Sequence, residues 1–366
     1  MVVYELWPAL NDGGSGLAAL AWVLATAVLA LVGSILAVVG SAAVWVVWAR
    51  LARIATTHAV EYPRPMGTTE VAWRTLTTAV KKIPGLAGKP STQTAFYRLI
   101  RSLALAGPFL NRYTRTVSMM VFVTCDSSEN DLQEAMAEDS PPLNFGSNLS
   151  WLSPMAGAPP ILAPLARVGI DMVRLLTDPQ FPFSLLGAVH ARQAIRTHLP
   201  LEPLRKVLLQ SSLQSEMQID AFRPVRRGTE IDIVISIAHV GEERKAIIDY
   251  VVTILAFHTH PESALDSLAS SRPPWNHAPL DELVPVGRLA VPAGAGKAFA
   301  TVCGDRNPIH ISPVAARLFG FPGCIAHGMH VAAPIVDTVL SSYTEPANAA
   351  GLTIHIGFSK PGCMFG

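Results

Sequence analysis

An uncharged, strongly apolar run near the N-terminus constrains this chain more than any other feature. No charged residue lies between Asp12 and Arg50, so residues 13–49 form a neutral stretch of 37 residues. The apolar part of this stretch exceeds the roughly 20 residues that a membrane-spanning helix needs. Tryptophan residues flank it on both sides, where interfacial aromatic side chains are expected. We therefore predict a membrane anchor over residues 1–50.

Other interpretations of the run fit less well. A cleaved signal peptide begins with positive charge, whereas this N-terminus carries Glu5 and Asp12. A core helix of this length normally has a polar face, and a hairpin of two short helices around Gly33 stays open. The orientation follows from residues 50–116, whose eight Arg and three Lys against two Glu give 11 − 2 = +9. By the positive-inside rule, we expect a single-pass protein whose C-terminal domains face the cytosol of an undetermined organelle.

Composition excludes several classes of protein. The formal net charge is +1, from 28 basic and 27 acidic side chains, which argues against a dedicated nucleic-acid binder. Outside the neutral run the composition is that of a globular protein, with room for two domains of about 100–200 residues each. The four cysteines are scattered without zinc-ligand spacing, so we expect neither a metal site nor a disulfide scaffold.

The periodicity of the next part of the chain predicts an α+β fold. Residues 161–176 place apolar side chains at three- and four-residue spacing, which indicates an amphipathic or buried helix. Strand-like segments then follow, the last two joined by a polar, glycine-containing turn. These segments are residues 187–196, 213–222, 230–238 and 245–257. A helix followed by an antiparallel meander is an α+β pattern.

The same plan begins again after a proline-rich segment at residues 261–285. The expected elements are a strand at 287–294, helices at 297–302 and from Ser312, a longer helix over 328–342 and a strand from residue 352. Ser312 and Pro313 supply an N-cap residue and a proline at the first helical position.

A carboxylate and a histidine flank a tight turn in this second half. Asp305 and His310 are five residues apart across Asn307-Pro308. Pro308 disfavours helical backbone at Asn307, and an Asn side chain can turn the chain. The loop could therefore hold a carboxylate and an imidazole on one rim.

These groups suit a defined chemistry. A carboxylate and a histidine that share one water can divide general-base and general-acid work. Gly328 begins the following apolar helix, where a carbonyl oxygen can approach its N–H and the positive helix terminus. This combination suits the addition of water to a carbon–carbon double bond conjugated to a thioester.

Two motifs carry a family resemblance. Gly304-Asp-Arg-Asn-Pro-Ile-His310, together with Ile325-Ala-His-Gly-Met329, closely resembles the signature of MaoC-like (R)-specific enoyl-thioester hydratases, which have the hot-dog fold. Phe181-Pro-Phe-Ser-Leu-Leu-Gly-Ala-Val-His190 and Arg223-Pro-Val-Arg-Arg-Gly-Thr-Glu230 resemble the non-catalytic first half of double hot-dog members. The resemblance covers roughly residues 115–361.

The resemblance implies a role for each matching residue. Asp305 and His310 would activate the water, and the Gly328 N–H would polarise the thioester carbonyl. Asn307 would be a positioning residue, and His327 would shape the turn beside the substrate. The resemblance also implies that no metal and no redox cofactor are needed, and that the acyl chain is carried on coenzyme A or an acyl carrier protein. The expected partners are the acyl thioester and a membrane but no nucleic acid, and a homodimer stays open.

The chain departs from the family at its end. Family members add at least two long strands after the strand that residues 354–361 resemble, so we expect the second hot-dog to be truncated. The predicted organisation is a membrane anchor (1–50), a basic linker (51–110), a non-catalytic hot-dog (111–262), a linker (263–282) and an incomplete catalytic hot-dog (283–366).

Three functions are compatible with these observations. The first is reversible hydration of trans-2-enoyl thioesters to (R)-3-hydroxyacyl thioesters in fatty-acid metabolism. The second is a catalytically inactive protein that binds acyl thioesters or acts as a scaffold. The third is a hot-dog thioesterase, against which the Asp-x-Asn-Pro-x-His loop argues.

Overall fold

The computed structural model of the chain has two compact units, residues 1–54 and 55–366, and each is described by itself. The structure describes residues 16–51, 59–61, 68–78, 96–103, 105, 107–124, 160–178, 181–185, 188–210, 212–240, 245–258, 287–343 and 351–358. The predicted linker of residues 263–282 and the residues after 358 lie outside these ranges.

The described residues of the first unit form the helix α1 (Gly16–Leu51), which contains most of the neutral run. By length and composition, Trp22–Ser41 can cross a membrane. The hydroxyl groups of Thr26 and Ser34 donate to the carbonyls of Trp22 and Ala30 within the helix. Polar groups in lipid must be satisfied internally in this way.

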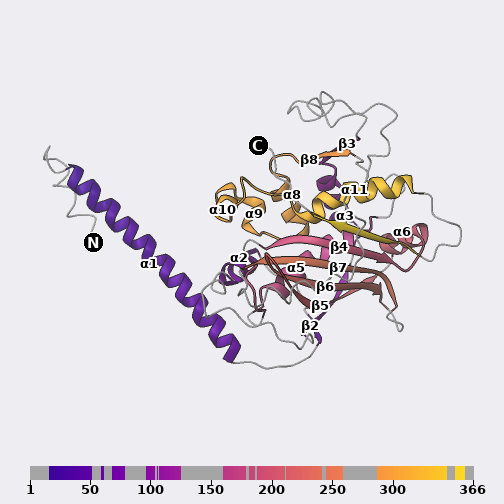
Figure 1. The fold of residues 1–366 in the computed structure, drawn as a ribbon, viewed down its shortest axis with the longest axis horizontal. Coiled ribbons are helices and arrows are strands. Elements are labelled where there is room, and N and C mark those ends of the chain that lie inside the picture. The colour runs from indigo at the N-terminus through magenta and orange to yellow at the C-terminus, as the bar shows by residue number, and fades with distance from the viewer. Residues whose placement is uncertain are drawn as a thin grey trace. The chain divides into compact units, whose positions relative to one another are not determined.

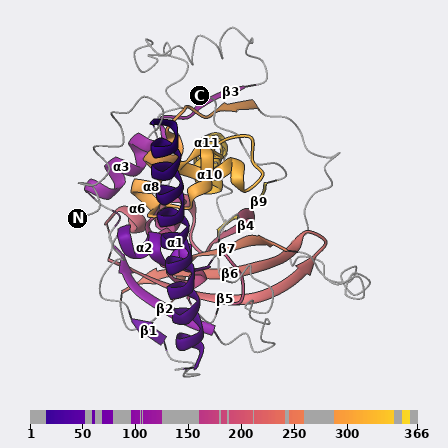
Figure 2. The same cartoon turned by 90° about the vertical axis from the view of Figure 1, so that its left-hand side faces the viewer.

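A seven-stranded sheet dominates the second unit, in the order β1-β2-β5-β6-β7-β4-β9. Every neighbouring pair is antiparallel except β1 and β2, and Figure 2 shows β5, β6 and β7 side by side. The strands are β1 (Ala59–Glu61), β2 (Phe96–Leu103), β4 (Val189–Thr197), β5 (Leu213–Val225), β6 (Gly228–His239), β7 (Ala246–Phe257) and β9 (Thr353–Gly357).

Helix α5 (Ala163–Leu176) packs against one face of this sheet. The alternate residues Ile231, Ile233 and Ile235 of β6 are fully buried with it in one hydrophobic core. Three more helices accompany this part of the fold, namely α2 (Thr68–Thr77), α3 (Pro108–Val117) and α6 (Leu201–Gln210). This helix on an antiparallel sheet is the predicted α+β arrangement.

The second half of the unit is built around α11 (Gly328–Ser342), which Figure 1 shows on the β4–β9 side of the sheet. Strand β9 pairs with β4 of the first half, so both halves share one sheet. Strand β8 (Gly287–Ala290) pairs instead with β3 (Val121–Thr124). In the described part of this half, the other helices are α8 (Ala295–Cys303), α9 (Pro308–Ile311) and α10 (Pro313–Leu318).

The structure confirms the predicted α+β class, but some of its elements differ from those predicted. The helix at 328–342 has the predicted bounds. However, the predicted basic linker contains β2, which pairs with β5 inside the main sheet. Helix α6 was not predicted either, although its buried Leu201, Leu204 and Leu208 have helical spacing.

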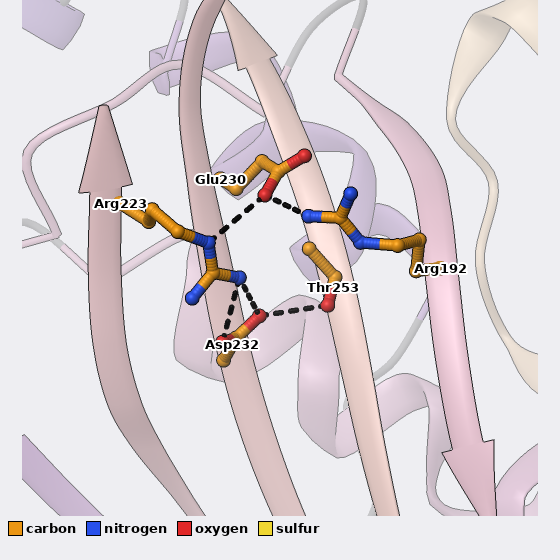
Figure 3. A network of polar contacts seen from close by, with 5 residues as sticks. All are labelled: Arg192, Arg223, Glu230, Asp232 and Thr253. Atoms are coloured by element: carbon orange, nitrogen blue, oxygen red, sulfur yellow. Dashed lines mark hydrogen bonds and ion pairs between the residues drawn. The ribbon is translucent and has the colours of Figure 1, made fainter. Parts of the chain in front are cut away.

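A buried network of charges lies on the sheet face opposite α5 (Figure 3). Asp232 alternates with the core residues of β6, so its side chain points the other way. It binds Arg223 of β5 through two hydrogen bonds of 3.0 and 2.8 Å. Glu230 pairs with both Arg223 and Arg192 of β4. Charges as buried as these are tolerated in a protein when they are paired.

Candidate active site

The loop that carries Asp305 is held against the first half of the unit. It follows α8, which ends at Cys303 and is capped by Gly304 with a φ of 76°. A side chain at Gly304 would lie 2.9 Å from Ile170 of α5, and one at Gly169 would lie 2.7 Å from the carbonyl oxygen of Cys303. These two glycines allow α8 and α5 to touch, so the helix of the first half positions the loop.

The Asp-x-Asn-Pro sequence forms a tight turn, as predicted. The backbone N–H of Asn307 donates to Oδ1 of Asp305 at 2.9 Å, and Asn307 Oδ1 accepts from the N–H of Ile309 at 3.5 Å. Asn307 therefore caps α9, with Pro308 at its first position. Ser312 caps α10 in the same way by accepting from Ala315 at 3.3 Å.

Asp305 and His310 face each other, with 3.9 Å between Oδ2 and Nε2. His310 Nδ1 lies 2.8 Å from the carbonyl oxygen of Ile325. A carbonyl only accepts, so Nδ1 carries the proton and Nε2 of the neutral ring keeps its lone pair. Burial lowers the pKa of His310 below its ordinary value, against the opposing effects of the Asp305 charge and the Ile325 carbonyl. The ring is thus prepared to accept a proton at Nε2.

His327 contacts both Asp305 and His310. Its ring stacks on that of His310 with 3.8 Å between centroids, and Nε2 donates to the backbone carbonyl of Asp305 at 3.1 Å. Burial, followed by the neighbouring His310, lowers the pKa of His327 well below its ordinary value. The bond from His327 ties the start of α11 to the loop that carries Asp305.

One atom each of Asp305, His310 and His327 lie within 4.8 Å of one another, as metal ligands can. The hydrogen bonds favour another use of these groups. His327 Nε2 already donates to the Asp305 carbonyl, so its lone pair is on Nδ1. Only Asp305 Oδ2 and His310 Nε2 keep free electron pairs that face each other.

A cavity of about 270 Å³ opens beside these groups and is lined by both halves of the unit. Its polar and charged lining residues are Asp305, Asn307, His310, His327, His190 and Arg227. The rest is largely apolar, as a site for an aliphatic chain requires. The apolar lining comes from α5 (Met172, Val173, Leu176), from Leu185, from the end of β7 (Ile254, Leu255, Phe257) and from Phe358.

Gly328 lies at the cavity wall, where α11 begins. In the described part of the chain, the N–H groups of Gly328 and Met329 donate to no protein acceptor. The N-terminus of a helix presents such free N–H groups together with a partial positive charge. An oxygen that gains negative charge would be stabilised here.

All five predicted site residues thus come together: Asp305, His310, Asn307, His327 and Gly328 line one cavity. Their chemical roles stay predictions. His190 of β4 also lines the cavity, although it was not among the predicted site residues. His190 ends the Phe181–His190 motif, and that was the signal that could have indicated it.

Comparison with known proteins matches residues 292–361 to the MaoC like domain. The 3-hydroxyacyl-thioester dehydratase X of Mycobacterium tuberculosis is 28% identical over 202 residues, which are 55% of this chain and 65% of that protein. The fatty acid synthase subunit beta of Gibberella zeae is 48% identical over 66 residues, which are 18% of this chain and 3% of that protein. The chain therefore spans less than two thirds of either relative.

The solved structures that resemble this chain have low TM-scores. The crystal structure of HtdX from Mycobacterium tuberculosis has a TM-score of 0.40 and 26% identity, and covers 56% of this chain and 74% of its own. A MaoC-like dehydratase has a TM-score of 0.43 and 15% identity, and covers 72% of this chain and 82% of its own.

Proposed function

Since this chain carries a MaoC-like dehydratase domain, we propose that it reversibly hydrates trans-2-enoyl thioesters to (R)-3-hydroxyacyl thioesters. The observation that carries the proposal is the 3.9 Å gap between Asp305 Oδ2 and His310 Nε2. One water oxygen can lie about 2.8 Å from both atoms at once. The adjoining apolar cavity then accommodates the acyl chain.

The reaction adds both parts of one water to the double bond. The water oxygen bonds to C3, while its proton passes to the Asp305–His310 pair, which returns a proton to C2. Negative charge moves onto the thioester oxygen during the attack, and the N–H groups at the start of α11 stabilise it. No electrons leave the substrate, so we propose that the reaction needs no redox cofactor and that coenzyme A or an acyl carrier protein takes part only as the carrier.

One assay separates this function from its alternatives. Purified protein is incubated with crotonyl-CoA while loss of the enoyl absorbance and release of free thiol are followed. Loss of absorbance without thiol supports hydration. Thiol release would indicate a thioesterase, and absence of both changes would indicate an acyl-thioester-binding or scaffold protein.

The pH profile should reflect the lowered pKa of His310. Protonation of Nε2 removes the base, so activity falls as pH decreases through the His310 pKa. Because burial holds this pKa below 6.5, we expect the acidic limb of kcat/KM to lie below pH 6.5. Rates measured from about pH 5 to about pH 9 test this. An acidic limb above 6.5 would contradict the assignment of the base.

We also propose that α1 anchors the protein in a membrane, with the second unit in the cytosol. The 36 residues of α1 correspond to about 54 Å of helix, more than the ~30 Å hydrocarbon core. We expect the full chain to stay in the membrane pellet through washes with high salt and alkaline carbonate. Deleting residues 1–50 should release it, with added salt if the basic segment binds headgroups. Recovery of the full chain in the soluble fraction would refute the anchor.

A further inference from the structure

A β-bulge brings His190 into the cavity. In the pairing of β4 with β7, His190 lies opposite Ile254 and Arg192 opposite Thr253, which leaves Ala191 as an extra residue. In a regular strand, residues two apart point to the same face. Here Arg192 reaches the charge network on one face, whereas His190 lines the cavity on the other. Bulges beside active sites commonly redirect a side chain in this way.

The ring of His190 is fixed on two sides. Its Nε2 lies 3.1 Å from the carbonyl oxygen of Arg192 and donates to it. Its other side packs against Phe358, with 4.9 Å between ring centroids, and the N–H of Phe358 donates to the carbonyl of Ala191 at 2.9 Å. Burial lowers the pKa of His190 to about 4, so the ring is neutral near pH 7 and Nδ1 keeps its lone pair.

The free edge of the ring meets the first residue of α11. A side-chain carbon built on Gly328 would lie 2.9 Å from Nδ1 of His190 and 3.2 Å from its Cβ and Cγ. The ring therefore touches this turn without room for one methyl group. The N-cap residue His327 gives the helix no side-chain capping bond, because its ring bonds to the Asp305 carbonyl instead. The packing of His190 on Gly328 is a second contact that holds this turn.

We propose that His190 is a positioning residue contributed by the first half: packed on Gly328, it keeps the N–H groups of Gly328 and Met329 directed at the thioester carbonyl. The part that concerns the carbonyl rests on the proposed function. The predicted non-catalytic half thus supports the reacting end of the substrate as well as the acyl chain.

The role of His190 is tested by comparing the full-length wild type in detergent with the variants His190→Ala and His190→Gln. Gln can donate to the Arg192 carbonyl from nearly the position of Nε2 and fills much of the same space. Turnover of crotonyl-CoA is measured together with hydrogen exchange of the amides of residues 325–333. His198→Ala is the matched control, because His198 follows the same strand but pairs with Asp249 and does not line the cavity.

We expect His190→Ala to lower kcat by about 10- to 100-fold. This is less than the loss in kcat of about 10²–10³-fold that follows removal of an oxyanion-hole donor. KM should change less than kcat, because the charge on the oxygen develops only in the transition state. Exchange at residues 325–333 should become faster, and His190→Gln should restore most of both properties. The control should match the wild type.

The proposal would be overturned if His190→Ala changed neither kcat nor the exchange rates. It would also be overturned if His190→Gln lost as much kcat as His190→Ala while keeping the wild-type melting temperature. If the wild type itself does not hydrate crotonyl-CoA, the proposed function fails. Hydrogen exchange then still decides whether His190 holds the start of α11.

Discussion

Replacing Asp305 by Asn, or His310 by Ala, should lower kcat by about 10²–10⁴-fold, the usual contribution of a positioned acid or base. Each change removes one of the two groups that would share the water across the 3.9 Å gap. Because we propose that the two groups act together on one water, the double variant should be little worse than either single variant. Hydration of crotonyl-CoA by equal amounts of folded protein measures the loss.

The control for this experiment is Asp220→Asn, because Asp220 is exposed on β5 and does not line the cavity. Its kcat should equal that of the wild type. Circular dichroism of all variants should agree at the assay temperature. His310→Ala loses the buried bond to the Ile325 carbonyl, so its melting temperature should fall, and activities are compared where every variant is folded. Near-normal activity of both active-site variants would remove Asp305 and His310 from the mechanism.

Replacing Arg223 by Met should destabilise the protein by about 3–5 kcal/mol, because removal of one partner leaves buried charges uncompensated. Arg223 is only 7% exposed and is the shared partner of Glu230 and Asp232 (Figure 3). The loss is a large fraction of the ~5–15 kcal/mol by which domains are stable. Urea or thermal unfolding of the two proteins measures it.

Arg226→Met is the matched control, because Arg226 is exposed at the adjoining turn. Its unfolding free energy should stay within about 0.5 kcal/mol of the wild type. A small effect at Arg223 would mean that water, rather than the network, compensates Glu230 and Asp232.

The Asp305–Ser312 loop could be predicted because its structure is local. Asn307-Pro308 and Ser312-Pro313 specify turns and caps through neighbouring backbone groups, and the structure contains both caps. The apolar spacing of α5 and α11 likewise depends only on residues a few positions apart. Such signals are present in any single sequence.

Elements that depend on distant partners could not be predicted. Strand β2 carries Arg98 and Arg101 and lies in a basic segment, so its composition resembles a linker. It becomes a strand because it pairs with β5, more than a hundred residues later. The position of His190 depends on the register of β4 against β7, which periodicity does not determine, because one extra residue reverses which face a side chain occupies.

The pairing of β4 with β9 should make the site more sensitive to heat than the rest of the sheet. Strand β9 has five residues, and in the described part of the chain it pairs with β4 alone. Short strands of this kind open locally at a lower free-energy cost than the whole fold. Opening would separate Phe358 from His190 and expose β4 as a sheet edge to which another chain can pair. Warming should therefore inactivate the site, and start aggregation, while the rest of the sheet is still folded.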